Sequence, residues 1–80
     1  MHELGVLNQI VRTVVRIAKE NKIKKIKFVT IEVGRDSSFV PMFLEKLYPV
    51  AIDQIGLMNE SELRIVMVDG RSLQIKDIGY

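Results

Sequence analysis

The amino terminus holds the residues of this chain that are best suited to metal chemistry. The sequence begins Met1-His2-Glu3, and His2 is the only histidine among the 80 residues. A terminal amine, one or two deprotonated backbone amides and an imidazole at position 2 can lie in one plane, which is the tetragonal nitrogen geometry that Cu(II) and Ni(II) favour. Glu3 can add a carboxylate oxygen or orient the imidazole. An ordinary polar start to a helix, with Glu3 at the positive end of the helix dipole, explains the same residues, and both interpretations stay open on this evidence.

No second group of residues indicates chemistry. Ser37 and Ser38 have no histidine or lysine placed to activate them, and helix capping explains them better. The carboxylates show no paired spacing that suggests a general acid and a general base. The chain has no cysteine, which excludes disulfides, thiol nucleophiles and zinc sites built from thiolates. We therefore expect a protein that is not an enzyme and that binds no zinc.

Length and composition are those of one small folded domain. A chain of 80 residues forms a single domain, and a hydrophobic fraction of 48% is too high for a disordered chain. The first twenty residues contain no uninterrupted apolar stretch like that of a signal peptide or membrane span, so we expect a cytoplasmic protein. The net charge is only +2, with most of the excess in one lysine cluster: Lys19, Lys22, Lys24, Lys25 and Lys27. Complementing the negative end of a helix dipole explains these lysines better than nucleic-acid binding does.

The elements that must position the terminus begin with an amphipathic helix and a strand. Apolar residues recur at helical spacing between residues 4 and 21, at Leu7, Ile10, Val11, Val14, Ile17 and Ala18. Asn21 suits the left-handed residue that ends such a helix. The segment 24–34 is rich in β-branched residues and predicts a strand.

A second helix follows the strand. Ser37 or Ser38 can cap it, and Pro41 suits its first turn. Pro49 predicts a kink or an early end, because proline has no N–H and its ring crowds the preceding turn. The predicted buried face consists of Phe43, Leu44, Leu47, Tyr48, Ala51, Ile52 and Ile55.

Two strands, within ELRIVMV and SLQIKDI, close the chain. The alternating apolar residues of the two strands lie on one face of the sheet if Ile65 pairs with Leu73. A three-residue loop, Val68-Asp69-Gly70 with Gly70 left-handed, gives this pairing. The predicted fold class is therefore α/β (α+β), with two helices packed on a three-stranded β-sheet in the order α-β-α-β-β. A single domain spans residues 1–80.

Several short segments then point to a known family. The chain starts MHELGVL, continues with the helix to Asn21 and reaches VTIEVG at 29–34. It has FVP at 39–41, SELRI at 61–65 and LQIKDI at 73–78. In this order the segments resemble the HypA/HybF family of nickel-delivery chaperones for hydrogenase and urease maturation, whose members begin Met-His-Glu. The resemblance spans nearly the whole chain, and Met-His-Glu is its most specific element.

The resemblance implies a nickel site at the amino terminus. His2 is then the principal ligand, the Met1 amine and nearby backbone nitrogens complete a plane around Ni(II), and Glu3 supports it. The implied partners are a hydrogenase large-subunit precursor and the GTPase that cooperates in nickel insertion. Family members also carry a zinc domain between the last two strands, whereas this chain passes from Val68 to Arg71 through Asp-Gly. We therefore expect a nickel-binding domain that lacks the zinc-ribbon insertion.

Two further expectations concern association and rival functions. We expect a homodimer, because the missing zinc domain should uncover apolar surface and a three-stranded sheet leaves free edges. The alternative to nickel binding is a metal-free interaction or regulatory module related to the chaperone, and nucleic-acid binding through the lysine cluster is a weaker third possibility. Titration with Ni(II) separates the first two.

Overall fold

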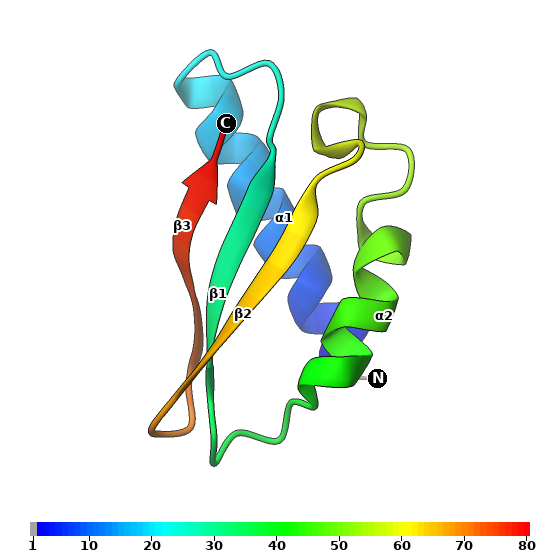
Figure 1. The fold of residues 1–80 in the computed structure, drawn as a ribbon. Coiled ribbons are helices and arrows are strands. Elements are labelled where there is room, and N and C mark those ends of the chain that lie inside the picture. Colours follow the sequence, from blue (N-terminus) through cyan, green and yellow to red (C-terminus); the bar gives the residue numbers. More distant parts are fainter. Residues whose placement is uncertain (1) are drawn as a thin grey trace.

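The elements of the chain follow one another in the predicted order. The computed structural model describes residues 2–80, and for His2 it describes the backbone alone. Figure 1 shows helix α1 (His2–Glu20), strand β1 (Phe28–Gly34), helix α2 (Pro41–Ala51), the short 3-10 helix η1 (Gly56–Met58) and strands β2 (Glu62–Val68) and β3 (Leu73–Gly79). Two helices and a three-stranded mixed sheet confirm the predicted α+β fold class. None of the helices in residues 2–80 is long and apolar enough to cross a membrane.

The strand order differs from the predicted hairpin. β1 is the central strand, parallel to β2 on one side and antiparallel to β3 on the other. The predicted pairing of Ile65 with Leu73 is therefore wrong: Ile65 lies opposite Ile31, and Leu73 lies opposite Val33. The physical reason is α2, because a helix that connects two strands brings them into parallel pairing. β2 thus occupies one edge of β1 and leaves the other edge to β3, while both apolar rows still share one face.

The connection between β2 and β3 crosses the end of β1. It covers four residues, 69–72, rather than the predicted three, and it spans two strand spacings, or about 10 Å. The N–H of Gly34, at the end of β1, donates to the carbonyl of Ser72 at 2.8 Å. A Cβ at position 34 would overlap the carbonyl oxygen of Gly70, so only glycine lets the connection pass this close. Gly70 has φ of +103°, which confirms its predicted left-handed conformation.

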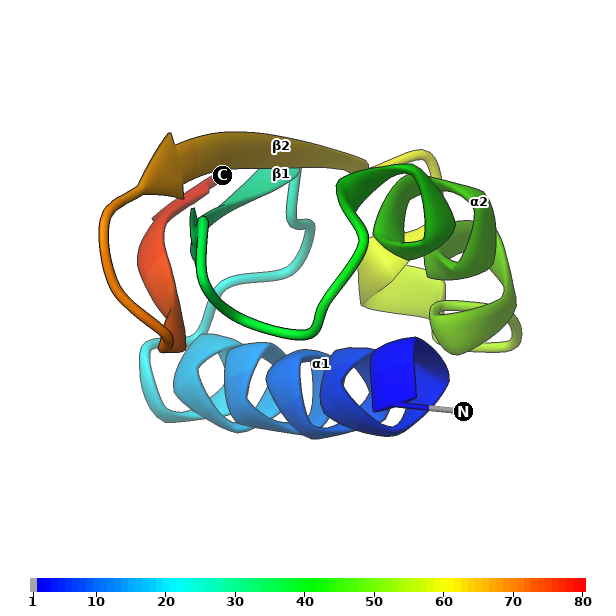
Figure 2. The same ribbon diagram turned by 90° about the horizontal axis from the view of Figure 1, so that it is seen from below.

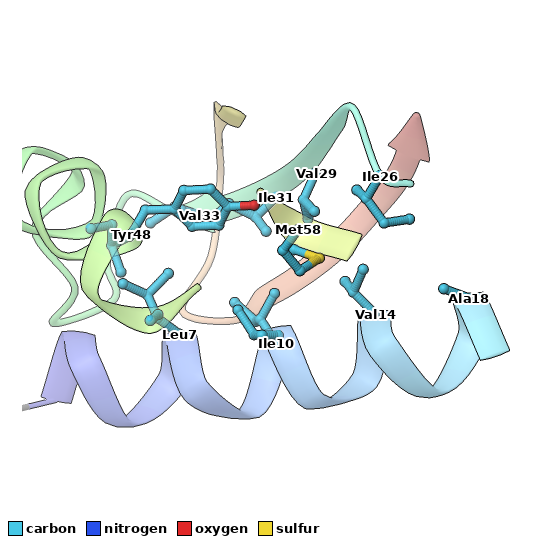
Figure 3. Close-up of a cluster of buried hydrophobic side chains, with 13 residues drawn as sticks. Leu7, Ile10, Val14, Ala18, Ile26, Val29, Ile31, Val33, Tyr48 and Met58 are labelled. Carbon is cyan, nitrogen blue, oxygen red and sulfur yellow. The ribbon is translucent and has the colours of Figure 1, made fainter. Parts of the chain in front are cut away.

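The hydrophobic core lies between α1 and the sheet. α1 covers one face of the sheet, and α2 lies beside α1 near β2 (Figure 2). Figure 3 shows side chains of α1 directed toward those of β1, α2 and η1, and the buried set comprises Leu7, Ile10, Val11, Val14, Ala18, Ile26, Val29, Ile31, Val33, Leu44, Tyr48, Ala51 and Met58. The core therefore fixes α1 along its length, from the first turns to the last.

The start of α2 is not capped by a serine. Its N-cap is Val40, which makes no side-chain cap hydrogen bond. Ser37 instead donates its hydroxyl to the carbonyl of Gly34 at 2.7 Å, within the turn that follows β1. The prediction that Ser37 or Ser38 caps the helix is therefore wrong, because the turn residues close the end of the strand and the helix starts later.

The end of α2 agrees with the effect predicted for Pro49. α2 ends at Ala51, two residues after this proline, and does not continue to Ile55. The predicted buried face holds for Leu44, Tyr48 and Ala51, which are buried. Phe43 is an exception, since 45% of it is exposed.

The end of α1 and the start of β1 also differ slightly from the prediction. The left-handed residue after α1 is Lys22, with φ of +57°, rather than Asn21. Asn21 donates its side-chain amide to the carbonyl of Ile17 at 2.8 Å instead. The predicted strand over 24–34 begins at Phe28, because the preceding residues form the connection from α1 in which Ile26 is buried.

Candidate functional site

Two of the three predicted metal-binding residues, His2 and Glu3, lie at the start of α1. Met1 and the side chain of His2 are outside the described residues. α1 begins at His2, so the backbone of His2 and Glu3 belongs to its first turn. The first N–H groups of any α-helix have no acceptor within the helix. Amide nitrogens in this turn can therefore bind a metal without breaking helical hydrogen bonds.

Glu3 ties the first turn of α1 to the start of α2. Only 7% of this residue is exposed, and its Oε2 accepts the backbone N–H of Val40 at 3.0 Å. Val40 is the N-cap of α2 and has no cap of its own. In a capping box, a glutamate three residues further along the same helix accepts this N–H. Here the acceptor comes from another helix, 37 residues earlier in the chain.

The ends of two helices meet at the Glu3 carboxylate. Glu3 is the acidic residue of the first turn of α1, and the same carboxylate binds the N-cap residue of α2. Each helix N-terminus carries about half a positive charge from the helix dipole. A buried carboxylate is costly unless hydrogen-bond donors and positive potential compensate for lost hydration. Both are present here, and the carboxylate joins the first turn of α1 to the start of α2.

Apolar side chains border this end of the molecule. Figure 1 shows the start of α1 beside the first turns of α2. At the beginning of α2, Val40 is 39%, Met42 is 56% and Phe43 is 45% exposed. The first turns of α2, which lie beside the start of α1, therefore expose apolar surface.

Sequence reasoning missed the part that Val40 plays. A backbone N–H has no residue signature, and a hydrogen bond across 37 residues leaves no local pattern. The available signal was the Val-Pro step at 40–41, because Pro41 favours the first helical position and a valine side chain cannot cap. A helix with that start needs an acceptor from elsewhere in the fold, and Glu3 supplies it.

A further pair of polar side chains has a structural role. Tyr48 and Ser61 share a hydrogen bond of 2.8 Å between their hydroxyl oxygens. Burial raises the pKa of Tyr48 above its ordinary value of 10.0, and the hydrogen bond from Ser61 partly opposes this shift. Among the described side chains, no group of three His, Asp or Glu residues could hold a metal ion.

Comparison with known proteins assigns the family. The family model described as "Hydrogenase/urease nickel incorporation, metallochaperone, hypA" matches residues 1–78. This chain belongs to the HypA family. A curated HypA relative, a hydrogenase maturation factor from Methanocella arvoryzae, is 31% identical over 68 residues, which cover 85% of this chain and 59% of the relative. The chain thus spans less than two thirds of the length of that HypA protein.

A solved structure supports the HypA fold independently. The solution structure of the Ni metallochaperone HypA from Helicobacter pylori matches with a TM-score of 0.87, over 96% of this chain and 95% of that chain. The two sequences are 13% identical, so this likeness concerns the fold alone. A metallochaperone carries a metal rather than catalysing a reaction, and the family description therefore agrees with the prediction that the chain is not an enzyme.

Proposed function

We propose that this HypA-family chain captures Ni(II) at its amino terminus for hydrogenase or urease maturation. The Met1 amine, the His2 imidazole and backbone amide nitrogens form a planar nitrogen set. Glu3 positions this set from the body of the fold, rather than being its main ligand. Nickel is the cargo that the protein binds and passes on.

The observation that carries the proposal is the hydrogen bond between Glu3 and Val40. It joins Glu3 to the start of α2 at 3.0 Å, so that the anchored residue follows Met1 and His2 directly. A short segment before a fixed residue loses little conformational entropy when it closes around a metal. The exposed apolar side chains of Val40, Met42 and Phe43 further suit a site that hands its cargo to another protein.

Titration of Ni(II) into protein with its authentic amino terminus tests the site. We expect one Ni(II) per chain with the absorption bands of a square-planar complex, and loss of both in His2→Ala. Gln9→Ala, a change at an exposed position of the same helix, is the control and should bind as the unchanged protein does. Full affinity and an unchanged spectrum in His2→Ala would place the site elsewhere. Absence of Ni(II) binding by the unchanged protein would instead support a metal-free interaction module.

The proposed function extends to partners and to assembly. The recipients are a hydrogenase large-subunit precursor and the nickel-insertion GTPase, in the cytoplasm. Residues 1–80 act as one nickel-binding domain without the zinc-ribbon insertion, whose place corresponds to the connection at 69–72. The chain forms a homodimer through its sheet, because β2 and β3 each have one edge outside the three-stranded ladder and β2 exposes Val66 and Met67.

Light scattering at high protein concentration tests the dimer. We expect a mass of two chains. Proline in place of Lys76, within the edge strand β3, should shift the population toward one chain if this edge pairs, because proline removes a backbone donor. A single-chain mass for the unchanged protein over the whole concentration range would contradict the proposal.

A further inference from the structure

A groove with an apolar floor lies between the second half of α1 and the segment that follows α2. Its volume is about 700 Å³. The floor consists of the side chains of Val11, Val15, Ile55 and Leu57. Val11 is buried, and the other three are half-buried. The groove thus offers apolar surface that no described residue covers.

Basic side chains form the rim of this groove on α1. Arg12, Arg16 and Lys19 line it, all three are exposed, and none of them has a salt-bridge partner among the described residues. Their spacing of four and three residues places them in one row along the helix. Glu20 is the only acidic residue of the lining, so the rim presents a net positive charge.

The opposite wall is held in place by the backbone. The N–H of Ile26 donates to the carbonyl of Leu57 at 2.8 Å, and the N–H of Met58 donates to the carbonyl of Ile55 at 3.0 Å. Met58 is fully buried in the core. Gln54 has φ of +69°, which turns the chain back toward α1 after α2 ends. The groove is therefore preformed, and a ligand need not order this wall.

We infer that this groove docks an acidic amphipathic helix of a partner protein. The lining on α1 runs from Val11 to Glu20, which is about 13 Å or two and a half helical turns. An apolar stripe at i, i+3 and i+4 fits a floor of this length. Carboxylates beside the stripe at spacings of three and four residues would face Arg12, Arg16 and Lys19. The apolar floor supplies most of the affinity, and the charged rim supplies orientation and association rate.

The location of the groove separates docking from metal capture. Figure 1 shows the carboxyl-terminal end of α1 and η1 at one end of the molecule and the start of α1 at the other. A partner held in the groove leaves the amino terminus uncovered. This inference goes beyond the proposed nickel site and does not require it, since binding of a peptide can be measured without metal.

Fluorescence polarisation with designed peptides tests the inference. The probe is a labelled 16-residue helix with leucines at i, i+3, i+4 and i+7 and glutamates at the flanking positions. We expect saturable binding that weakens as salt rises. Two companion peptides should bind at least tenfold more weakly: one with lysines in place of the glutamates, and one with serines in place of the leucines. Equal binding of the serine peptide would overturn the inference, because it would show attraction by charge alone.

Matched protein variants locate the binding. Arg12→Glu with Arg16→Glu should weaken the peptide at least tenfold, whereas Lys46→Glu with Lys76→Glu changes the net charge equally and should not. Both variants should keep their Ni(II) stoichiometry and urea midpoint within error, which separates docking from folding and from the nickel site. Equal loss in both variants would overturn the inference. The inference would also be overturned if the unchanged chain were a dimer and Arg12→Glu with Arg16→Glu converted it to a monomer. A second copy of the chain would then occupy the groove.

Discussion

At the scale of single residues, Glu3 links two segments that are far apart in the sequence. Its buried carboxylate accepts the N–H of Val40 and holds two helix starts together. Glu3→Ala should lower the free energy of unfolding by about 1–3 kcal/mol, because a charge-assisted hydrogen bond is lost and the part-buried N–H of Val40 loses its acceptor. Urea denaturation measures this loss. Glu3→Gln should recover part of the stability, since its amide oxygen can accept the same N–H.

The control for this prediction is Glu45→Ala, which removes an exposed carboxylate from α2. It should change the free energy of unfolding by less than about 0.5 kcal/mol. A Glu3→Ala variant as stable as Glu45→Ala would show that the contact with Val40 does not hold the two helices together.

Tyr48 gives a pH dependence at the same scale. Its pKa is raised by burial, so the unfolded chain releases this proton near pH 10.0 while the native protein still holds it. Stability that is complete below pH 10 should therefore fall as the pH rises through 10 and toward the native pKa. Tyr48→Phe should remove this part of the alkaline loss, which urea midpoints between pH 8 and pH 11 can measure.

Ser61→Ala distinguishes the effect of the buried Tyr48 phenol on stability from the effect of its hydrogen bond. This variant loses the bond to Tyr48 but keeps the buried phenol, so it should keep the alkaline loss while being about 1 kcal/mol less stable at neutral pH. The same alkaline loss in Tyr48→Phe as in the unchanged protein would assign the effect to other groups.

Single residues also show which features of the candidate site could be predicted from the sequence. Met1, His2 and Glu3 stand out from the sequence because a unique histidine beside a terminal amine is a chemical signal. The placement of Glu3 in the first turn of α1 was among the predicted alternatives, and the structure confirms it. Its bond to Val40 could not be predicted, because it depends on how α2 packs beside α1 and not on any residue near Glu3.

At the scale of elements, the sequence pattern predicted a hairpin between β2 and β3, whereas residues 69–72 cross the end of β1. Asp69-Gly70 between two apolar rows is a strong local signal for a hairpin, and the left-handed Gly70 and the common apolar face are both confirmed. The neighbours of each strand are nevertheless set by tertiary packing. β1 has three fully buried side chains, Val29, Ile31 and Val33, and a strand so apolar favours the centre of the sheet.

Gly34→Ala tests this crossing directly. The added Cβ would overlap the backbone of Gly70, so either the connection or the end of β1 must shift. We expect a loss of roughly 1–3 kcal/mol in the free energy of unfolding, as for other overpacked sites. Amide hydrogen exchange should be faster at Asp36, whose N–H donates to the carbonyl of Gly70 at 2.9 Å.

Gly5→Ala is the matched control. Gly5 lies in α1, and a Cβ there meets no atom within 4 Å, so this change should stabilise the protein by about 0.5–1 kcal/mol. If Gly34→Ala were equally stabilising, β2 and β3 would have to be joined by a path other than the one across β1.

At the scale of the whole molecule, α1 connects the two regions for which different roles are proposed. A helix of 19 residues is about 28 Å long, with the candidate metal ligands at its start and the basic groove along its second half. The buried face of α1 holds both ends on the same core. The fold therefore separates the proposed docking groove from the start of α1, where nickel binding is proposed.

A Ni(II) titration that compares two forms of the protein tests whether the terminal amine takes part in the proposed site. One form has the authentic terminus, and the other carries Gly-Ser-Gly-Ser before Met1, which moves the terminal amine away from His2 and leaves every other residue in place. We expect one Ni(II) per chain with square-planar absorption bands for the authentic form, and loss of those bands with at least a hundredfold weaker binding for the extended form. Equal affinity and identical bands in both forms would contradict this expectation, because the amine of Met1 would then take no part in the site.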